Sequence, residues 1–302
     1  MKKNLIFDNI IPSFYLKFLR KGLLLTFLFH SLLNDEDELR SNYIYPHQPM
    51  TVEHLRIFIE YYLENNYKFV SPNDILKGLK KDERYVLITF DDGYYNNINA
   101  LPVLKEYDVP AVFFVCINHI KQNRSFWWDI IYRERIKRRS TKEEILREVT
   151  SLEPKTNEEI EKHIEKAFGR NIFTPKSDID RPFSPQELKE FANQKKHVVI
   201  GNHTMNHEVL PPLSKEKIEY EISYTQSEIK KIIGEAPIVI SYPYGKFSNK
   251  VIRISKKCGL KLGVTSESKK NYLPIKDLFK IYRFALIGNN DMKLKCEMLH
   301  RI

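Results

Sequence analysis

The stretch Tyr85-Val-Leu-Ile-Thr-Phe-Asp-Asp-Gly-Tyr-Tyr-Asn-Asn97 joins a strand-like apolar run to two adjacent acids. Its first six residues are mostly apolar and β-branched, a pattern typical of a buried strand. Successive strand residues point to opposite faces, but a turn that starts at Asp92 can direct both Asp91 and Asp92 toward one cavity. Adjacent carboxylates repel each other, so both stay ionised only beside a cation or hydrogen-bond donors. A solvated turn is the competing interpretation, and the buried strand that precedes the acids favours a site.

Short apolar strands alternate with amphipathic helices along most of the chain. This alternation predicts an α/β fold with a parallel sheet. We expect strands at 22–29, 67–70, 85–90, 110–115, 197–200, 237–241, 260–264 and 282–287. We expect helices at 51–65, from 72, at 101–107, from 185, at 214–234 and at 251–258.

The alternation is interrupted by a charged segment, residues 121–182, that predicts a mainly helical insertion. Both tryptophans of the chain, Trp127 and Trp128, lie near its start. Their aromatic faces suit sugar rings, but aromatic residues at the start of a helical insertion more often serve as packing anchors, which is the favoured interpretation. The predicted organisation is an N-terminal arm (1–21), a main domain (22–290) that contains the insertion, and a C-terminal helix (291–302). A polar loop with His47 is expected at 33–49.

The composition favours a soluble-type globular chain with anionic partners. Its 302 residues carry a formal net charge of +10, which suits acidic glycans, membrane surfaces or nucleic acid, although a lysine-rich surface alone explains it equally well. The sequence lacks the interleaved basic and aromatic residues of a nucleic-acid module, so we expect no nucleic-acid partner. Cys116, Cys258 and Cys296 are odd in number and far apart, which excludes a disulfide framework and a cysteine-based metal site.

The N-terminal region imitates a signal peptide, because Arg20-Lys21 precede the apolar run 22–29. No small-residue cleavage site follows this run, and the run is too short to span a bilayer. We interpret it as a buried strand and predict a cytoplasmic location, with contact at a membrane surface as an additional option. The sequence does not indicate the oligomeric state.

Three predicted strands end in polar motifs: Asp91-Asp92-Gly93, His203-Thr-Met-Asn-His207 and Tyr242-Pro-Tyr-Gly245. The carboxyl ends of parallel strands meet on one face, where sites form. The two histidines would share a face if their turn is helical. With one aspartate they form a two-histidine, one-carboxylate set that suits catalytic zinc, although an isolated His-x-x-x-His is weak evidence. The adjacent aspartate, which does not bind the metal, is then placed to act as a general base for hydrolysis of an amide or ester.

These three motifs resemble, in order and spacing, those of the polysaccharide deacetylases (NodB homology domain, carbohydrate esterase family four). The flanking segments 111–115 and 210–234 resemble the family as well, and the resemblance covers roughly residues 22–290. It implies a distorted (β/α)7-type barrel that holds one divalent metal ion, most often Zn²⁺.

The resemblance also implies roles for single residues. Asp92, His203 and His207 would bind the metal, Asp91 would be the catalytic base, and the backbone of Tyr244 would bind the oxyanion and the substrate. Thr204 matches a family hydroxyl residue that orders the second motif by hydrogen bonding.

The chain departs from the family pattern at several positions. Ser241 stands where many members have an arginine that pairs with the base, and Arg283 is a candidate to replace it from a neighbouring strand end. The late histidine motif that supplies the general acid is missing, since residues 284–288 contain no histidine. His30, at the end of the first strand, matches a histidine near the metal in one branch of the family. We expect His30 to protonate the leaving amine, with a core or loop histidine as an equal alternative.

The predicted function is metal-dependent removal of acetyl groups. We expect the substrate to be an N-acetylated sugar of a cell-surface glycan or its lipid-linked precursor, contacted by Tyr244, Trp128 and Arg283. The alternatives are an O-acetyl esterase and an inactive member of the family that binds glycan or acts as a scaffold.

Overall fold

The computed structural model describes residues 22–46, 50–288 and 291–301. The predicted N-terminal arm and His47 lie outside the described residues. The described strands form one sheet in the order β7-β6-β5-β4-β3-β1-β8, with β2 paired to β3 and β9 paired to β1. The strands are β1 (Leu23–Phe29), β2 (Lys68–Phe69), β3 (Arg84–Phe90), β4 (Ala111–Val115), β5 (Val198–Asn202), β6 (Val239–Ser241), β7 (Leu262–Val264), β8 (Asn271–Tyr272) and β9 (Phe284–Ala285).

The central strands are parallel and buried on both faces. β1 pairs with β3 along its full length, and β4 pairs in register with β5. Every residue of β1 and β4 is buried, which explains why these strands are continuous apolar runs in the sequence. The predicted α/β fold is confirmed.

The segment 281–285 connects the two ends of the curled sheet. The backbone N–H of Ile281 donates to Gly263 O at 3.0 Å, and its carbonyl accepts from the N–H of Thr265 at 2.9 Å, so the segment lies along β7. A few residues later, β9 pairs in parallel with β1. The sheet is thereby closed into a distorted barrel. Apolar side chains of β1, β3, β4, β6 and β7 fill its interior, including Leu24, Phe114 and Val264.

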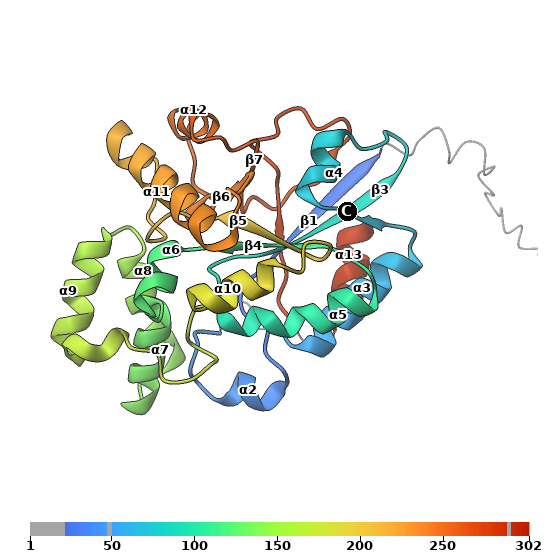
Figure 1. Ribbon diagram of the computed structural model, residues 1–302. Coiled ribbons are helices and arrows are strands. Elements are labelled where there is room, and N and C mark those ends of the chain that lie inside the picture. Colours follow the sequence, from blue (N-terminus) through green and yellow to red (C-terminus); the bar gives the residue numbers. More distant parts are fainter. Residues whose placement is uncertain (1–21, 47–49, 289–290, 302) are drawn as a thin grey trace, which may run out of the picture.

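Helices cover the outside of the sheet, as Figure 1 shows for α3, α5 and α10 below it and for α4 and α12 above it. The main hydrophobic core lies between the sheet and the helices α3, α5, α10 and α13. The helices of this main part are α2 (Glu36–Arg40), α3 (Val52–Glu64), α4 (Pro72–Lys77), α5 (Ala100–Glu106), α6 (Ile117–Gln122), α10 (Pro185–Ala192), α11 (Lys215–Ile233), α12 (Asn249–Lys257) and α13 (Met292–Arg301).

Side-chain caps fix where several of these helices begin. Thr51, Ser71, Ser184 and Ser214 each accept a hydrogen bond from a backbone N–H of the first helical turn, as the sequence predicts. The prediction of an irregular loop at 33–49 misses α2, which Asp35 caps ahead of an acidic first turn.

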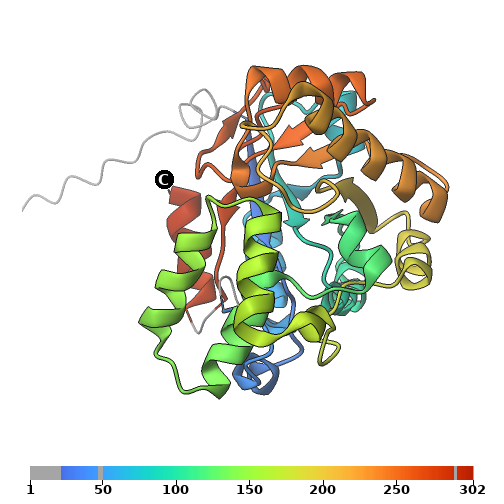
Figure 2. The ribbon, with the colours of Figure 1, turned by 90° about the vertical axis from the view of Figure 1, so that its left-hand side faces the viewer.

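The segment between α6 and α10 is mainly helical, as predicted. It contains α7 (Trp127–Lys137), α8 (Lys142–Leu152) and α9 (Asn157–Phe168), which form a layer in front of the sheet in Figure 2. These helices share a core of their own that includes Trp127, Ile145 and Ile164. Within the described residues, no helix combines the length and apolar character needed to cross a membrane.

Gly201 on β5 leaves room for the ring of Phe114 on the neighbouring strand β4, just before the histidine motif. A Cβ atom on residue 201 would overlap the buried ring of Phe114. We expect Gly201→Ala to lower the free energy of unfolding by about 1–3 kcal/mol through overpacking, measured by urea denaturation. Adding Phe114→Leu should make the double variant more stable than the sum of the two single changes predicts. Strict additivity would contradict this explanation.

Candidate active site

A sharp turn after β3 directs both aspartates into one cavity. The backbone N–H of Asp91 still donates to Phe29 O at 2.9 Å, in continuation of the sheet. The next two residues, Asp92 and Gly93, have φ angles of 76° and 82°. This left-handed backbone is uncommon for a residue other than glycine, although aspartate tolerates it better than most. The predicted turn at Asp92 is confirmed.

The two histidines follow β5 on a turn that is not helical. Thr204 and His207 have φ angles of 67° and 57°, and α11 begins only at Lys215. The condition under which the two histidines would share a helical face is therefore not met. The rings are nevertheless close, with centroids 4.8 Å apart, because the left-handed residues fold the loop back on itself.

Buried acceptors hold this loop. Asn202 Oδ1 accepts from the N–H of Thr204 at 2.8 Å, and Glu221 Oε2 accepts from the N–H of Met205 at 3.0 Å. The Thr204 hydroxyl, by contrast, has no hydrogen-bond partner among the described residues. The structure therefore assigns the ordering of the loop to Asn202 and Glu221, and the expected hydrogen bond of the Thr204 side chain is not found.

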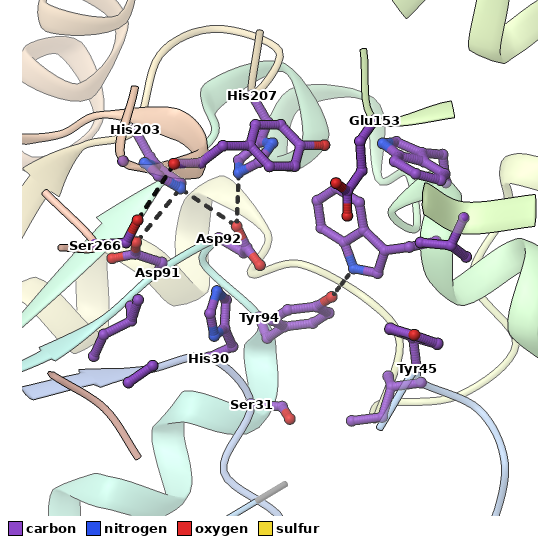
Figure 3. A pocket seen from close by; sticks show the side chains of 18 of the residues that line it. His30, Ser31, Tyr45, Asp91, Asp92, Tyr94, Glu153, His203, His207 and Ser266 are labelled. Atoms are coloured by element: carbon purple, nitrogen blue, oxygen red, sulfur yellow. Dashed lines mark hydrogen bonds and ion pairs between the residues drawn. The ribbon is translucent and has the colours of Figure 1, made fainter. Parts of the chain in front are cut away.

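Asp92, His203 and His207 form a set that fits a divalent metal ion. One ligand atom from each lies within 4.8 Å of the others. Asp92 Oδ1 is 3.4 Å from His203 Nε2 and 3.6 Å from His207 Nε2, as Figure 3 shows. This oxygen is buried and has no hydrogen-bond partner in the part of the chain that the structure describes. A buried, unpaired carboxylate oxygen between two imidazole nitrogens is a suitable environment for a cation.

The two histidines differ in their surroundings. Nδ1 of His203 lies 2.8 Å from Ser241 O, which directs Nε2 toward Asp92. Burial alone would lower the pKa of His203, but the charges of Asp91 and Asp92 raise it overall. Burial and then the neighbouring His203 lower the pKa of His207 to about 3. His207 is therefore neutral, which metal ligation requires.

Asp91 is held by a buried arginine. Arg283 Nη1 and Nη2 donate to the two oxygens of Asp91, each at 2.8 Å, and the Ser241 hydroxyl donates to Oδ2 at 2.8 Å. Burial alone would raise the pKa of Asp91, but the Arg283 guanidinium and then His203 hold it well below its usual range. Asp91 is thus an ionised carboxylate that can accept a proton.

The structure confirms the expected pairing of Arg283 with Asp91. The same guanidinium donates to Thr89 Oγ1 and Thr265 O, both at 3.0 Å. Arg283 is only 1% exposed, so its geometry favours holding Asp91. Its direct contact with substrate stays a prediction.

One cavity of about 430 Å³ brings all the candidate residues together. Its lining includes the predicted catalytic, substrate-binding and metal residues His30, Asp91, Asp92, Trp128, His203, His207, Tyr244 and Arg283. Figure 3 shows His30 on the side of Asp92 opposite His203 and His207. Burial raises the pKa of both aspartates, and other groups lower it. His30 is near enough to be one of the groups that lower it, with a smaller effect than Arg283 has on Asp91 or His203 has on Asp92.

Tyr244 lies on a strained turn after β6. Its φ angle is 56°, and its ring meets the His207 ring edge-on at 4.8 Å. The following Gly245 has no room for a Cβ atom because Ser266 lies against it. The turn therefore holds Tyr244 beside the metal ligands, while the role of its backbone N–H stays a prediction.

A polar network that the sequence did not predict begins in the cavity wall, which Tyr45, Tyr94 and Trp128 help to form. Trp128 Nε1 donates to Tyr94 Oη at 2.9 Å, and Tyr94 Oη donates to Asp129 Oδ2 at 2.7 Å. The other oxygen of Asp129 accepts from the backbone N–H of Tyr45 at 2.7 Å. Tyr94 directly follows Asp-Asp-Gly. This position was the one feature of the sequence that could have indicated a role for Tyr94 at the site.

Comparison with known proteins identifies relatives of this chain. The family model described as polysaccharide deacetylase matches residues 78–263. YxkH of Bacillus subtilis (strain 168), whose name assigns it to the polysaccharide deacetylases, is 22% identical over 209 residues, which are 68% of this chain and 54% of YxkH. An uncharacterised 30.6 kDa protein of Geobacillus stearothermophilus is 21% identical over 180 residues, 59% of this chain and 44% of that protein. The chain thus spans about half the length of these curated relatives.

Solved structures share the fold. The Streptococcus pyogenes deacetylase PplD, solved in complex with acetate, has a TM-score of 0.62 and 17% identity and covers 92% of this chain and 99% of its own. A de-N-acetylase from Aggregatibacter actinomycetemcomitans has a TM-score of 0.61 and 19% identity and covers 91% of this chain and 99% of its own. At these identities the likeness establishes the distorted barrel as the common fold.

Removing the charge of Arg283 should expose the electrostatic cost of burying Asp91. We expect Arg283→Gln to lower the free energy of unfolding by about 3–5 kcal/mol near neutral pH, because a buried carboxylate loses its partner. Arg283→Lys keeps the charge but loses the two-pronged geometry, so its loss should be smaller. Urea denaturation with a chelator present measures both.

The loss should also depend on pH. In the wild type the native pKa of Asp91 lies below its unfolded value of about 3.9. The pair therefore stabilises the fold above that value, and this contribution is lost as pH falls through the native pKa. In Arg283→Gln, burial raises the native pKa above the unfolded value. The difference between the two proteins should thus be larger at about pH 7 than at about pH 4, and a constant difference would contradict the assignment.

The metal site predicts a defined metal content. Protein incubated with Zn²⁺ and desalted should retain about one ion per chain, measured by elemental mass spectrometry. His203→Ala and His207→Ala should each lose it. His163→Ala is the matched control, because His163 is exposed on α9 and pairs with Glu148. Equal retention by His203→Ala and His163→Ala would show that the ion binds elsewhere.

Proposed function

The chain belongs to the polysaccharide deacetylase family, and we propose that it removes acetyl groups from a glycan by metal-dependent hydrolysis. The observation that carries this proposal is the Asp91 carboxylate, held by two hydrogen bonds from Arg283, beside the candidate metal ligands. Asp91 Oδ2 lies 3.8 Å from His203 Nε2, and its partner Arg283 keeps it deprotonated. A buried base next to a metal site is the arrangement that hydrolysis of an amide or ester needs.

We assign Asp92, His203 and His207 as the residues that hold the metal. When bound, such an ion polarises the acetyl carbonyl and makes water more acidic. Asp91 accepts the proton of the attacking water at a carboxylate oxygen. Arg283 and Ser241 keep that carboxylate fixed through four hydrogen bonds among these groups, so little reorganisation is needed when the proton arrives.

The remaining steps use the opposite side of the cavity. His30 donates a proton to the nitrogen of the departing amine, because the C–N bond of an amide breaks readily only when that nitrogen is protonated. His30 lines the same cavity as Asp91, which fits this role. The backbone N–H of Tyr244 donates to the developing oxyanion, and the turn at residues 243–245 keeps Tyr244 at the cavity wall.

We propose an N-acetylated sugar of a cell-surface glycan, or its lipid-linked precursor, as the substrate. The aromatic side chains of Trp128 and Tyr244 in the cavity wall support a sugar ligand. An O-acetylated sugar is the alternative, since the same groups would attack an ester. The cytoplasmic location and contact with a membrane surface stay predictions.

Asp91→Asn tests the assignment of the base. The substitution keeps the shape and one acceptor for Arg283 but removes the basic oxygen. We expect turnover to fall by about 10²–10⁴-fold, while Zn²⁺ content stays at the wild-type level. Acetate release from N-acetylated chitooligosaccharides and from an O-acetylated xylan measures both candidate reactions.

Asp178→Asn is the control, because Asp178 is exposed and pairs only with a surface arginine among the described residues. Its turnover should equal that of the wild type. Undiminished turnover in Asp91→Asn would disprove the role of Asp91. Zn²⁺ binding without acetate release from either substrate in the wild type would favour the inactive glycan-binding alternative.

A further inference from the structure

His207 lacks the outer hydrogen bond that usually orients a metal-binding histidine. Its Nε2 faces Asp92 Oδ1 at 3.6 Å. Its Nδ1 is buried and has no hydrogen-bond partner within the described ranges. By contrast, Nδ1 of His203 bonds to Ser241 O. Histidine ligands ordinarily donate this second N–H to a fixed acceptor, so other contacts must set the orientation of the His207 ring.

Aromatic rings supply those contacts. The Trp128 ring lies 5.1 Å from the His207 ring at an interplanar angle of 68°, and the Tyr244 ring lies 4.8 Å away at 67°. Both are edge-to-face arrangements, which aromatic pairs prefer. Tyr244 comes from the turn after β6, whereas Trp128 comes from the helical insertion. The imidazole is therefore held between the main domain and the insertion.

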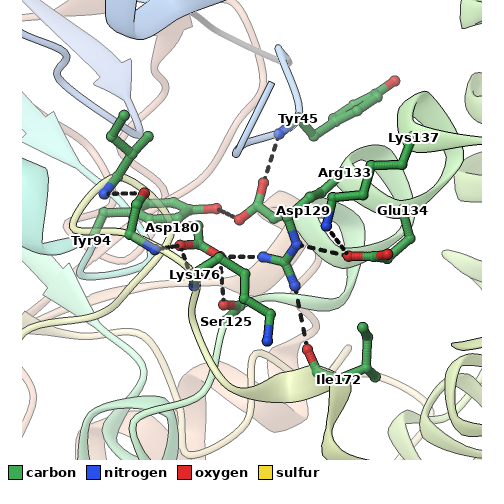
Figure 4. A network of polar contacts seen from close by, with 12 residues as sticks. Tyr45, Tyr94, Ser125, Asp129, Arg133, Glu134, Lys137, Ile172, Lys176 and Asp180 are labelled. Carbon is green, nitrogen blue, oxygen red and sulfur yellow. Dashed lines mark hydrogen bonds and ion pairs between the residues drawn. The ribbon is translucent and has the colours of Figure 1, made fainter. Parts of the chain in front are cut away.

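Trp128 is itself fixed on two sides. Its ring stacks on Phe126 at 4.6 Å and 12°, and Phe126 stacks on His119 at 4.0 Å and 16°. Its indole N–H donates to Tyr94 Oη, whose own hydrogen goes to Asp129, as Figure 4 shows. Asp129 is fully buried. Tyr94 is only two residues beyond Asp92, so this chain of bonds ties Trp128 to the metal motif.

We propose that Trp128 is a positioning residue for the metal ion. Its ring keeps the imidazole of His207 turned so that Nε2 faces Asp92, in place of the missing hydrogen bond. The helical insertion thereby contributes to metal affinity as well as to the cavity wall. This inference rests on the metal site of the proposed function, and it differs from sugar stacking, which would change substrate binding and leave metal binding unchanged.

Zn²⁺ affinity of the purified full chain tests the proposal, measured by competition with a chromophoric chelator. We expect Trp128→Leu to bind Zn²⁺ about 10- to 100-fold more weakly than the wild type, the usual effect of losing an orienting group. Trp128→Phe keeps an aromatic ring and should recover most of that affinity. Ile145→Val is the control, because Ile145 lies in the core of the insertion and the change loosens packing without removing the Trp128 ring.

Tryptophan fluorescence provides a second readout. The chain has two tryptophans, and the ring of Trp128 contacts a candidate ligand. Zn²⁺ should therefore change the emission of the wild type and of Trp127→Phe, whose remaining tryptophan is Trp128, more than that of Trp128→Phe, whose remaining Trp127 lines the same cavity. This comparison tests the contact between Trp128 and the metal site even if Trp128→Leu does not fold.

The outcomes separate the two proposals. Wild-type affinity in Trp128→Leu, or a Zn²⁺ response in Trp128→Phe as large as that in Trp127→Phe, would overturn the positioning role alone. An equal loss of affinity in Ile145→Val would also overturn it, because the loss would then come from general loosening of the insertion. If the wild type does not bind one Zn²⁺ ion per chain, the proposed function fails together with this inference.

Discussion

The burial of two adjacent carboxylates is the constraint on which the rest of this structure depends. Asp91 and Asp92 are 3% and 2% exposed, and each would lose several kcal/mol of hydration without a compensating partner. The two acids are compensated in different ways. Asp91 receives a guanidinium and a hydroxyl, whereas Asp92 faces two imidazole nitrogens and keeps an oxygen with no partner in the described structure. Asp91 is thereby paired with a fixed positive charge, whereas Asp92 has an environment that suits a cation.

Much of the fold follows from local sequence signals. The strands are continuous apolar runs because both faces of the sheet are covered, and the helix starts at Thr51, Ser71, Ser184 and Ser214 are determined by a side chain within the first turn. The three polar motifs could be assigned to one site because parallel strands bring their carboxyl ends together. The pairing of Arg283 with Asp91 could be anticipated only because the resemblance predicts an arginine partner for the base, and Ser241 occupies the position where the family has that arginine.

The remaining features of the site depend on contacts that local patterns do not encode. The i, i+4 spacing of His203 and His207 is that of two residues on one helical face. Their turn is not a helix, however, because it contains left-handed residues other than glycine. Asn202 and Glu221, which hold that turn, are ordinary polar residues when the sequence is considered alone. The hydrogen bond between the N–H of Tyr45 and Asp129 joins residues that are 84 positions apart. Only the packing of the insertion against the domain creates it.

The closure of the sheet by residues 281–285 has a consequence for how the protein is made. Arg283 stands 192 positions after Asp91 and arrives on the segment that joins β7 to β1. During synthesis, β3 and the two acids that follow it therefore leave the ribosome long before Arg283, the positive partner of Asp91, has been made. A nascent chain cannot bury Asp91 at low cost until residue 283 has emerged. The pairing of Asp91 with Arg283 thus makes completion of the candidate site wait for the segment 281–285, and chains that stop before this segment are left with an open sheet edge that proteases and chaperones can recognise.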